Sequence, residues 1–405
     1  MAVREAQIWN PFTEGYINDP YHYLSGLRED GELCRTINGH VLTLSYRLAK
    51  EVLQNNEFRT LEIAENLRIL EENHFAQSND TLITLRSIVS KWLLFLNPPL
   101  HTVLRKLMAD IFNRYRLTDI IQEVVDDVLS KAIQAKNIDT IQAIATPIPM
   151  KVIGRLMGLD DHAVLSLRSG LYSVGRIIEP FVSRYQLQEH DKSATAMLEY
   201  FQGVFEHKKK HPEDDFISDL IREGGKELPM SQLVSLALQL FWAGVETTIF
   251  SIGQTIYYLA QYPDEWQMIK KNPDVIKSAT EEFLRLASPV QYTVRIPPSD
   301  TRLDGIPVKA RQIVYVSLAA ANRDPDKFDN PHTCNAKRSP NPHVAFGQGI
   351  HTCLGARLGR DEIVRMLQWM ADRDVQMSRS NEPEWYPIIM MRGIKSLQAS
   401  IVARA

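Results

Sequence analysis

The sequence predicts a mainly α protein, with a large helical body, small β-sheets beside it and one long buried helix. Three observations carry this prediction. Apolar residues recur at three- and four-residue steps through most of residues 100–285, which is typical of amphipathic helices. Prolines and glycines are frequent over residues 289–351, which favours strands and loops there. Within the first of these ranges, residues 228–263 are almost uncharged.

The helical pattern is clearest over three segments before the uncharged stretch. It predicts helices over Thr102–Asn113, Thr118–Ala135 and Asp191–Lys210. Pro212 follows the third segment and is expected to end it, because proline cannot continue a helix. A last helical pattern runs from about Leu354 to Ala371.

Short runs rich in β-branched residues predict the strands. They are Gly39–Ser45 near the N-terminus, Gln312–Ser317 in the loop-rich region and Leu397–Val402 near the C-terminus. Because these runs are short and far apart, small sheets are expected rather than one large sheet.

The uncharged stretch Leu228–Pro263 predicts a long helix in the protein interior. It contains a single charged residue, Glu246, and Ser, Thr and Gln recur along it. That polarity is too high for a lipid-facing span, so a buried helix is predicted and no membrane association.

Composition excludes several classes of function. The chain has 405 residues, with 46 Lys and Arg against 49 Asp and Glu, a formal net charge of −3. No basic excess indicates nucleic acid or an anionic membrane as a partner. Three cysteines in a chain of this length suit a reducing compartment, and the first twenty residues show no targeting signal. A cytoplasmic protein is therefore predicted.

One glycine-rich run delivers a cysteine to the start of the last predicted helix. It reads Phe-Gly-Gln-Gly-Ile-His-Thr-Cys-Leu-Gly over residues 346–355. Glycines allow positive φ angles and close approach of a flat ligand. A helix N-terminus favours the thiolate of Cys353, which suits an axial iron ligand. Taken alone, a single cysteine is more often a small buried apolar residue.

The run resembles the Phe-x-x-Gly-x-x-x-Cys-x-Gly haem-binding signature of the cytochrome P450 family, with Phe346, Gly349, Cys353 and Gly355 in complete register. The resemblance implies the cytochrome P450 fold as a single domain over residues 1–405, with the long buried helix over the haem. It implies haem b as cofactor and Cys353 as the metal ligand, with Phe346 shielding its sulfur. His351 stands at a position that hydrogen-bonds a haem propionate, and Gly347 and Gly355 contact the cofactor.

The second constellation lies in the middle of the uncharged helix, over Ala243-Gly244-Val245-Glu246-Thr247-Thr248. A buried carboxylate is costly without a partner or a task, and a threonine there can bond the carbonyl one turn back. The plain alternative is a paired glutamate on a core helix. The resemblance implies that Glu246 and Thr247 are the acid–alcohol pair that delivers protons during oxygen activation, and that Ala243 faces the haem.

Further matches occur in the family's order. Glu282 and Arg285 lie one helical turn apart and resemble the Glu-x-x-Arg structural motif, which Arg338 is expected to complete. Arg295 and the pair His101 and Arg105 stand where the family contacts the haem propionates. Without the resemblance, each would be an ordinary surface or capping residue.

The implied function is that of a haem-thiolate monooxygenase, which hydroxylates, epoxidises or otherwise oxidises a hydrophobic small molecule in secondary metabolism. The substrate is expected free or bound to a carrier protein, in a pocket that includes Leu240, Val290, Thr293 and Ile389. Because 405 residues leave no room for a reductase domain, electrons are expected from a ferredoxin or flavodoxin with its reductase.

Two alternatives remain open at this point. In a structural zinc module, the pairs His332–Cys334 and His351–Cys353 with His343 would be ligands, although each pair has only one intervening residue. A haem-binding protein without turnover is the second alternative, against which the presence of Glu246 and Thr247 argues.

Overall fold

The computed structural model describes residues 8–75, 82–135, 137–180 and 182–403. The structure is 57% helical with several small sheets, which confirms the mainly α prediction. The chain divides into two compact units. Unit 1 combines the described residues up to Leu61, the short stretch that ends at Thr140, and the described residues from Phe250 onward; unit 2 contains the rest. That the whole chain is one domain remains a prediction.

Unit 1 is built on a five-stranded mixed sheet with the order β1-β2-β3-β8-β5. β3 and β8 pair in parallel, and β5 runs antiparallel to β8 at the sheet edge. The strands of this sheet are β1 (Ile8–Trp9), β2 (Leu33–Thr36), β3 (Val41–Thr43), β8 (Val314–Ser317) and β5 (Tyr292–Arg295).

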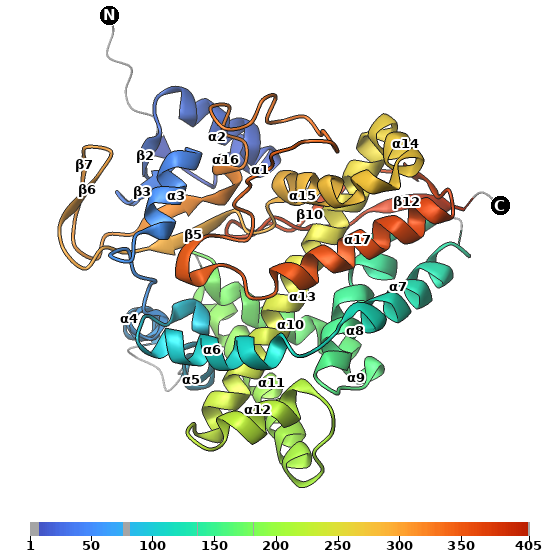
Figure 1. The fold of residues 1–405 in the computed structure, drawn as a ribbon. Coiled ribbons are helices and arrows are strands. Elements are labelled where there is room, and N and C mark those ends of the chain that lie inside the picture. Colours follow the sequence, from blue (N-terminus) through green and yellow to red (C-terminus); the bar gives the residue numbers. More distant parts are fainter. Residues whose placement is uncertain (1–7, 76–81, 136, 181, 404–405) are drawn as a thin grey trace, which may run out of the picture. The chain divides into compact units, whose positions relative to one another are not determined.

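The core of unit 1 lies where helix α3 (Tyr46–Gln54) covers this sheet (Figure 1). Leu48 and Val52 on one face of α3 are fully buried, as are Val314 and Val316 on β8. Ser45 begins the helix by accepting a hydrogen bond from the Leu48 backbone N–H at its side chain. Burial of this apolar face fixes the position of α3, whose C-terminal end lies next to Gly349 of the glycine-rich run.

The remaining elements of unit 1 are helices and three further small sheets. The order of the three-stranded sheet is β4-β12-β9, and β10–β11 and β6–β7 form two-stranded sheets. The helices are α1 (Glu14–Asn18), α2 (Pro20–Glu29), α14 (Pro263–Lys271), α15 (Ile276–Ala287), α16 (Leu318–Ala321) and α17 (Ala356–Asp372), with 3₁₀ turns η4 (Pro273–Val275) and η5 (Gly349–His351). The strands are β4 (Asn137–Asp139), β6 (Thr301–Leu303), β7 (Ile306–Val308), β9 (Gln376–Arg379), β10 (Glu384–Trp385), β11 (Ile394–Ser396) and β12 (Gln398–Val402).

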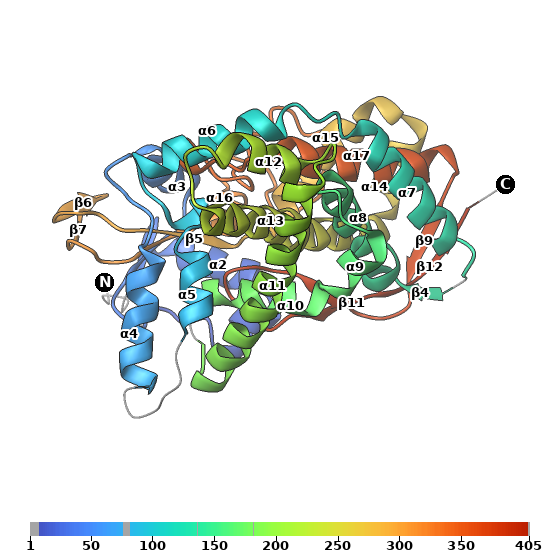
Figure 2. The ribbon, with the colours of Figure 1, turned by 90° about the horizontal axis from the view of Figure 1, so that it is seen from below.

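Unit 2 is helical throughout its described part. In Figure 2 α5 lies beside α11, and α6 beside α12. The helices are α4 (Ile63–Phe75), α5 (Ile83–Val89), α6 (Leu100–Phe112), α7 (Thr118–Ala132), α8 (Pro147–Leu156), α9 (Asp161–Ser166), α10 (Arg168–Gly175), α11 (Arg184–Lys210) and α12 (Phe216–Gly224). Short turns are η1 (Leu93–Phe95), the π-helical η2 (Ile141–Ala145) and η3 (Arg176–Ile178).

Helix α13 (Met230–Gln261) is the long helix that the uncharged stretch predicts. The boundary between the units falls within it, between Ile249 and Phe250. In the described part of the chain it is the one helix long and apolar enough to cross a membrane, but 72% of its most apolar window is buried inside the structure.

The predicted helices and strands are present. Thr102–Asn113 corresponds to α6, Thr118–Ala135 to α7, and the last helical pattern to α17. Helix α11 ends at Lys210, before Pro212, and begins at Arg184, two turns earlier than the pattern predicts, because Ser183 and Gln186 form a capping box there.

Candidate active site

The cysteine loop in unit 1 turns on two glycines. Gly347 and Gly349 have φ angles of +66° and +76°, which L side chains rarely adopt. A Cβ on Gly349 would lie 2.2 Å from the carbonyl oxygen of Leu53, at the end of α3. The Cys353 backbone N–H donates to the Phe346 carbonyl at 2.9 Å, which closes the loop. Gly349 is therefore required both for the turn and for the approach to α3.

Cys353 leaves this loop three residues before α17 begins at Ala356, as predicted. Its side chain is exposed and it is not in a disulfide. A Cβ on Gly355 would meet nothing within 4 Å, so the surface beside Cys353 is open to a flat ligand. His351 ends η5, two residues before the cysteine.

Glu282 and Arg285 on α15 form the buried network that the sequence predicts. Both side chains are fully buried, and two Arg285 nitrogens donate to the Glu282 carboxylate at 2.8 Å. Arg338 Nε donates to the same carboxylate at 3.0 Å. Burial would raise the pKa of Glu282, but the two arginines lower it below its usual value, so the carboxylate stays ionised. Arg285 also donates to the carbonyls of Asn322, Pro331 and Thr333, which ties the chain before the cysteine loop to α15.

Arg295 ends β5 as a buried cation. Its Nη1 donates to Thr293 Oγ1 at 3.1 Å and to the Val294 carbonyl at 2.8 Å. Only 5% of the residue is exposed, and desolvation lowers its pKa to about 10. No carboxylate of the described residues forms an ion pair with it. A buried guanidinium in this state suits an anionic group such as a haem propionate.

The predicted acid in unit 2 lies on the buried face of α13. Glu246 is fully buried, and its Oε1 accepts a hydrogen bond from Arg168 Nη1 at the start of α10. Its Oε2 has no hydrogen-bond partner among the described residues. Burial raises the pKa of Glu246 above its usual value. The nearby charges of Arg168 and Arg176 lower it, but their effect is smaller than that of burial. Arg168 was not predicted from the sequence; the signal was the pair of arginines eight residues apart, Arg168 and Arg176, with no other charged residue between them.

Thr247 bonds one turn back along α13. Its hydroxyl donates to the Ala243 carbonyl at 2.8 Å, while the helix continues without a break through this point. Ala243 and Gly244 are half-exposed. A Cβ on Gly244 would lie 2.8 Å from Ile153 Cδ1, so α13 passes close to α8 here. The bond to the carbonyl one turn back, which the sequence allows for a threonine here, is therefore present.

His101 and Arg105 lie four residues apart on α6 and therefore share one face. His101 is buried and Arg105 half-buried. A histidine and an arginine on one face provide the donors that a propionate pair needs.

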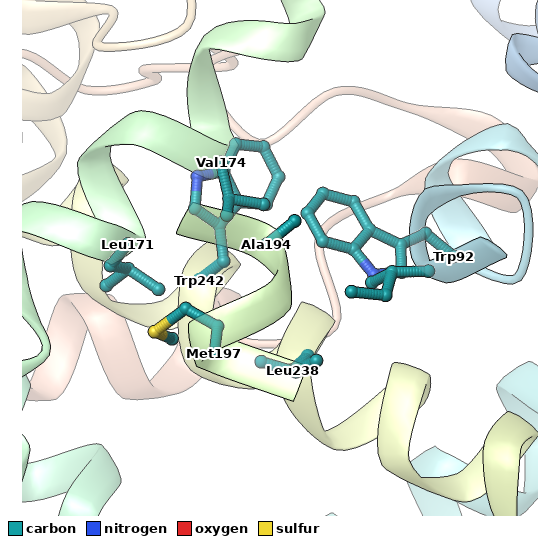
Figure 3. A pocket seen from close by; sticks show the side chains of 8 residues that line it. Trp92, Leu171, Val174, Ala194, Met197, Leu238 and Trp242 are labelled. Atoms are coloured by element: carbon teal, nitrogen blue, oxygen red, sulfur yellow. The ribbon is translucent and has the colours of Figure 1, made fainter. Parts of the chain in front are cut away.

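A narrow apolar cavity in unit 2, with room for about one water molecule, lies between α5, α10, α11 and α13. Figure 3 shows its side chains turned toward one another. Trp92 and Trp242 stack there with ring centroids 5.0 Å apart. The lining residues are Ile88, Trp92, Leu171, Val174, Ala194, Met197, Leu238 and Trp242.

The four predicted pocket residues lie in both units. Leu240 is buried on α13 of unit 2 and does not line this cavity, whose α13 residues are Leu238 and Trp242. In unit 1 Val290 bridges to Met391, which brings the chain around Thr293 beside the chain around Ile389. A role for these four in substrate binding stays a prediction.

The zinc alternative does not match the structure. His343 bonds to the Glu281 carboxylate at 3.0 Å and His332 to Ser25 Oγ at 3.2 Å. Among the described residues, no three His, Cys, Asp or Glu side chains come together in a way that would hold a metal ion.

The residues present fit a haem. Cys353 would supply the thiolate, the glycine loop beside it leaves open surface, and Arg295 is a buried cation that needs an anion. These features match the class of haem-thiolate oxidoreductases.

Comparison with known proteins gives the family. The sequence model described as cytochrome P450 matches residues 172–373. The biotin biosynthesis cytochrome P450 of Bacillus subtilis is 31% identical over 344 residues, which cover 84% of this chain and 87% of that protein. Cytochrome P450 monooxygenase PikC of Streptomyces venezuelae is 29% identical over 400 residues, 95% of this chain and 91% of that protein.

Solved structures agree with the sequence relatives. P450BioI, in complex with an acyl carrier protein ligated with hexadec-9Z-enoic acid, matches with a TM-score of 0.87 and 27% identity, over 96% of this chain and 100% of that chain. The chain belongs to the cytochrome P450 family. It is therefore a monooxygenase whose cofactor is haem b, and its family normally takes electrons from redox partners.

Proposed function

We propose that this monooxygenase oxidises a hydrophobic small molecule of secondary metabolism, such as a polyketide, peptide, terpene or fatty acyl group. The observation that carries the proposal is the apolar surface of α13 next to Glu246, part of which lines the small cavity of unit 2. Trp242 lines it one helical turn before Glu246 on α13, so apolar surface and the acid are neighbours on one helix.

Each candidate residue has a task in this function. Bound haem supplies the chemistry that inserts one atom of O₂ into a C–H or C=C bond. Cys353 would hold the haem, while His101, Arg105, Arg295 and His351 would bind its propionates. Phe346, Gly347, Gly355 and Ala243 would line its faces. Glu246 and Thr247 would hold and pass the protons that oxygen activation consumes.

Partners and location follow from the same class. Electrons would come from a ferredoxin or flavodoxin with its reductase, in the cytoplasm. The solved complex of P450BioI with a fatty acyl carrier protein supports a carrier-bound substrate as well as a free one.

The test is the absorption spectrum of the reduced protein under carbon monoxide, beside Cys353→Ala. A strongly red-shifted Soret band in the wild type alone is expected. A band that survives the loss of Cys353 would overturn the ligand assignment.

A substrate screen by spin-state shift comes second. Hydrophobic compounds should shift the wild-type spectrum, and product formation would separate a monooxygenase from a haem-binding protein without turnover. Trp242→Ala should widen the cavity and admit bulkier ligands; an unchanged ligand profile would remove this cavity from the substrate site.

A further inference from the structure

Two neighbouring glutamates on α15 serve two separate networks. Glu282 bonds to Arg285 and Arg338, the arrangement described above. Glu281 points to a different set of partners, His343 and Arg360, the second of which lies on α17. The sequence predicts a structural role for Glu282 and none for Glu281.

The Glu281 carboxylate is held at both oxygens. Arg360 Nε donates to Oε1 at 2.7 Å and Nη2 to Oε2 at 3.0 Å, a two-point contact. His343 Nε2 lies 3.0 Å from Oε2. The Ala345 backbone N–H donates to His343 Nδ1 at 3.2 Å, which orients the ring so that Nε2 faces the Glu281 carboxylate. Glu281 and Arg360 therefore form an ion pair, with His343 hydrogen-bonded to the same carboxylate.

The same two partners enclose Phe346. Arg360 Cζ lies 4.3 Å from the centroid of the Phe346 ring, within the range of a cation–π contact. The His343 ring centroid is 6.0 Å from that of Phe346, tilted by 42°. The Phe346 carbonyl in turn accepts the hydrogen bond from the Cys353 backbone N–H. Glu281 thus fixes, through two side chains, the aromatic ring at the start of the cysteine loop.

We propose that Glu281, Arg360 and His343 form a positioning clamp for Phe346, and that the opposing charges of Glu281 and Arg360 tune the reduction potential of the haem bound by Cys353. The inference rests on the proposed role of Cys353 as haem ligand. Reduction adds one electron to the iron and breaks no bond to the cysteine. A cation near the thiolate favours the added charge and an anion opposes it, and such surroundings tune haem potentials.

The experiment is a potentiometric titration of the haem protein with mediators, in wild type, Arg360→Gln and Glu281→Gln. Arg360→Gln leaves the negative charge and should shift the midpoint potential to more negative values. Glu281→Gln leaves the positive charge and should shift it to more positive values. A merely structural network would move both variants in the same direction.

Arg357→Gln is the matched control. Arg357 lies on the same helix, is 88% exposed at its side chain and pairs with Asp361 at 3.5 Å. Arg357→Gln changes the net charge by the same amount as Arg360→Gln but leaves the clamp intact. The midpoint potential of this variant should therefore stay at the wild-type value. An equal shift in both arginine variants would overturn the proposal, since the effect would then be one of overall charge.

Arg360→Lys keeps the inference testable if the glutamine variants lose haem. It retains the charge but not the planar two-point contact. Its potential should stay near that of the wild type, while its carbon monoxide complex should lose thiolate ligation faster on heating. Unchanged kinetics of that loss would refute the positioning role. A wild-type protein without a red-shifted carbon monoxide band would instead refute the proposed function.

Discussion

Arg168 is the residue that makes the buried Glu246 tolerable. The arginine side chain is 19% exposed, whereas the glutamate is fully buried, so the pair stands at the edge of the interior of unit 2. A buried carboxylate without its cation is strongly destabilising. The pair is therefore a structural requirement as well as part of the candidate proton path.

Arg168→Met should lower the free energy of unfolding by about 3 kcal/mol at pH 8. Burial raises the folded-state pKa of Glu246, so the folded protein binds a proton more readily than the unfolded chain. The destabilisation should accordingly shrink as the pH falls from 8 to 5.5. Urea unfolding at the two pH values measures it, and Arg168→Met with Glu246→Gln should lose the pH dependence. A pH-independent cost in the single variant would contradict the account.

Thr247→Ala removes the hydroxyl bonded to the Ala243 carbonyl and leaves the helix otherwise intact. We expect the variant to keep its haem but to divert consumed O₂ into hydrogen peroxide, because protons are delivered less well. The ratio of peroxide formed to O₂ consumed measures this. Coupling equal to that of the wild type would exclude Thr247 from the proton path.

At the scale of elements, glycine determines how closely α10 approaches α13. A Cβ on Gly175 would lie 2.2 Å from Trp242 Nε1, whereas a Cβ on Gly203 of α11 meets nothing within 4 Å. Gly175→Ala should cost about 1–3 kcal/mol by overpacking. Gly203→Ala should stabilise by about 0.5–1 kcal/mol, as alanine does in an exposed helix. Equal effects in denaturant unfolding would show that α10 can move away from α13.

The contact between α15 and α17 contributes to the stability of the fold by an amount that depends on pH. Burial would raise the pKa of Glu281, but the hydrogen bonds from His343 and Arg360 lower it to about 2. An acid whose folded pKa is lowered stabilises above its unfolded pKa, near 4.5, and loses that contribution as the pH falls toward 2. The Glu281→Gln variant should therefore match the wild type in stability at pH 2 and be less stable at pH 5, by about 3 kcal/mol. Thermal unfolding across this range checks it.

Elements with a strong local signal were predictable from sequence, and those set by distant contacts were not. Helices α6, α7 and α17 follow apolar periodicity, and β8 is a short apolar run. The start of α11 and the strand β1 were missed, since β1 has two residues and exists only through its pairing with β2.

The site divides in the same way. Cys353, Glu282, Arg285 and Arg338 could be predicted because their spacing along the chain is itself the signal. Arg168 and Arg360 could not, because each meets its carboxylate 78 and 79 residues away in the sequence. The sequence between two such partners contains no pattern that predicts their contact.

At the scale of the whole molecule, α13 belongs to both compact units, since the boundary falls inside one unbroken helix. If either unit unfolded, one half of this helix would lose the side chains against which it packs. A long apolar helix is not stable in water without such packing. We therefore expect one cooperative unfolding transition in calorimetry and in circular dichroism. Two separated transitions would contradict both this expectation and the single-domain prediction.

The three cysteines differ in burial, and this difference allows the haem occupancy of the protein to be measured by alkylation. Burial raises the pKa of the Cys34 thiol to about 12 and raises that of Cys334 well above its usual range, so neither offers much thiolate at neutral pH. Cys353 is exposed. An alkylating reagent at pH 7 should therefore add one mass label per chain in the haem-free protein and none once the iron holds the sulfur. The fraction of unlabelled chains in a mass spectrum would then count the haem-loaded molecules in any preparation.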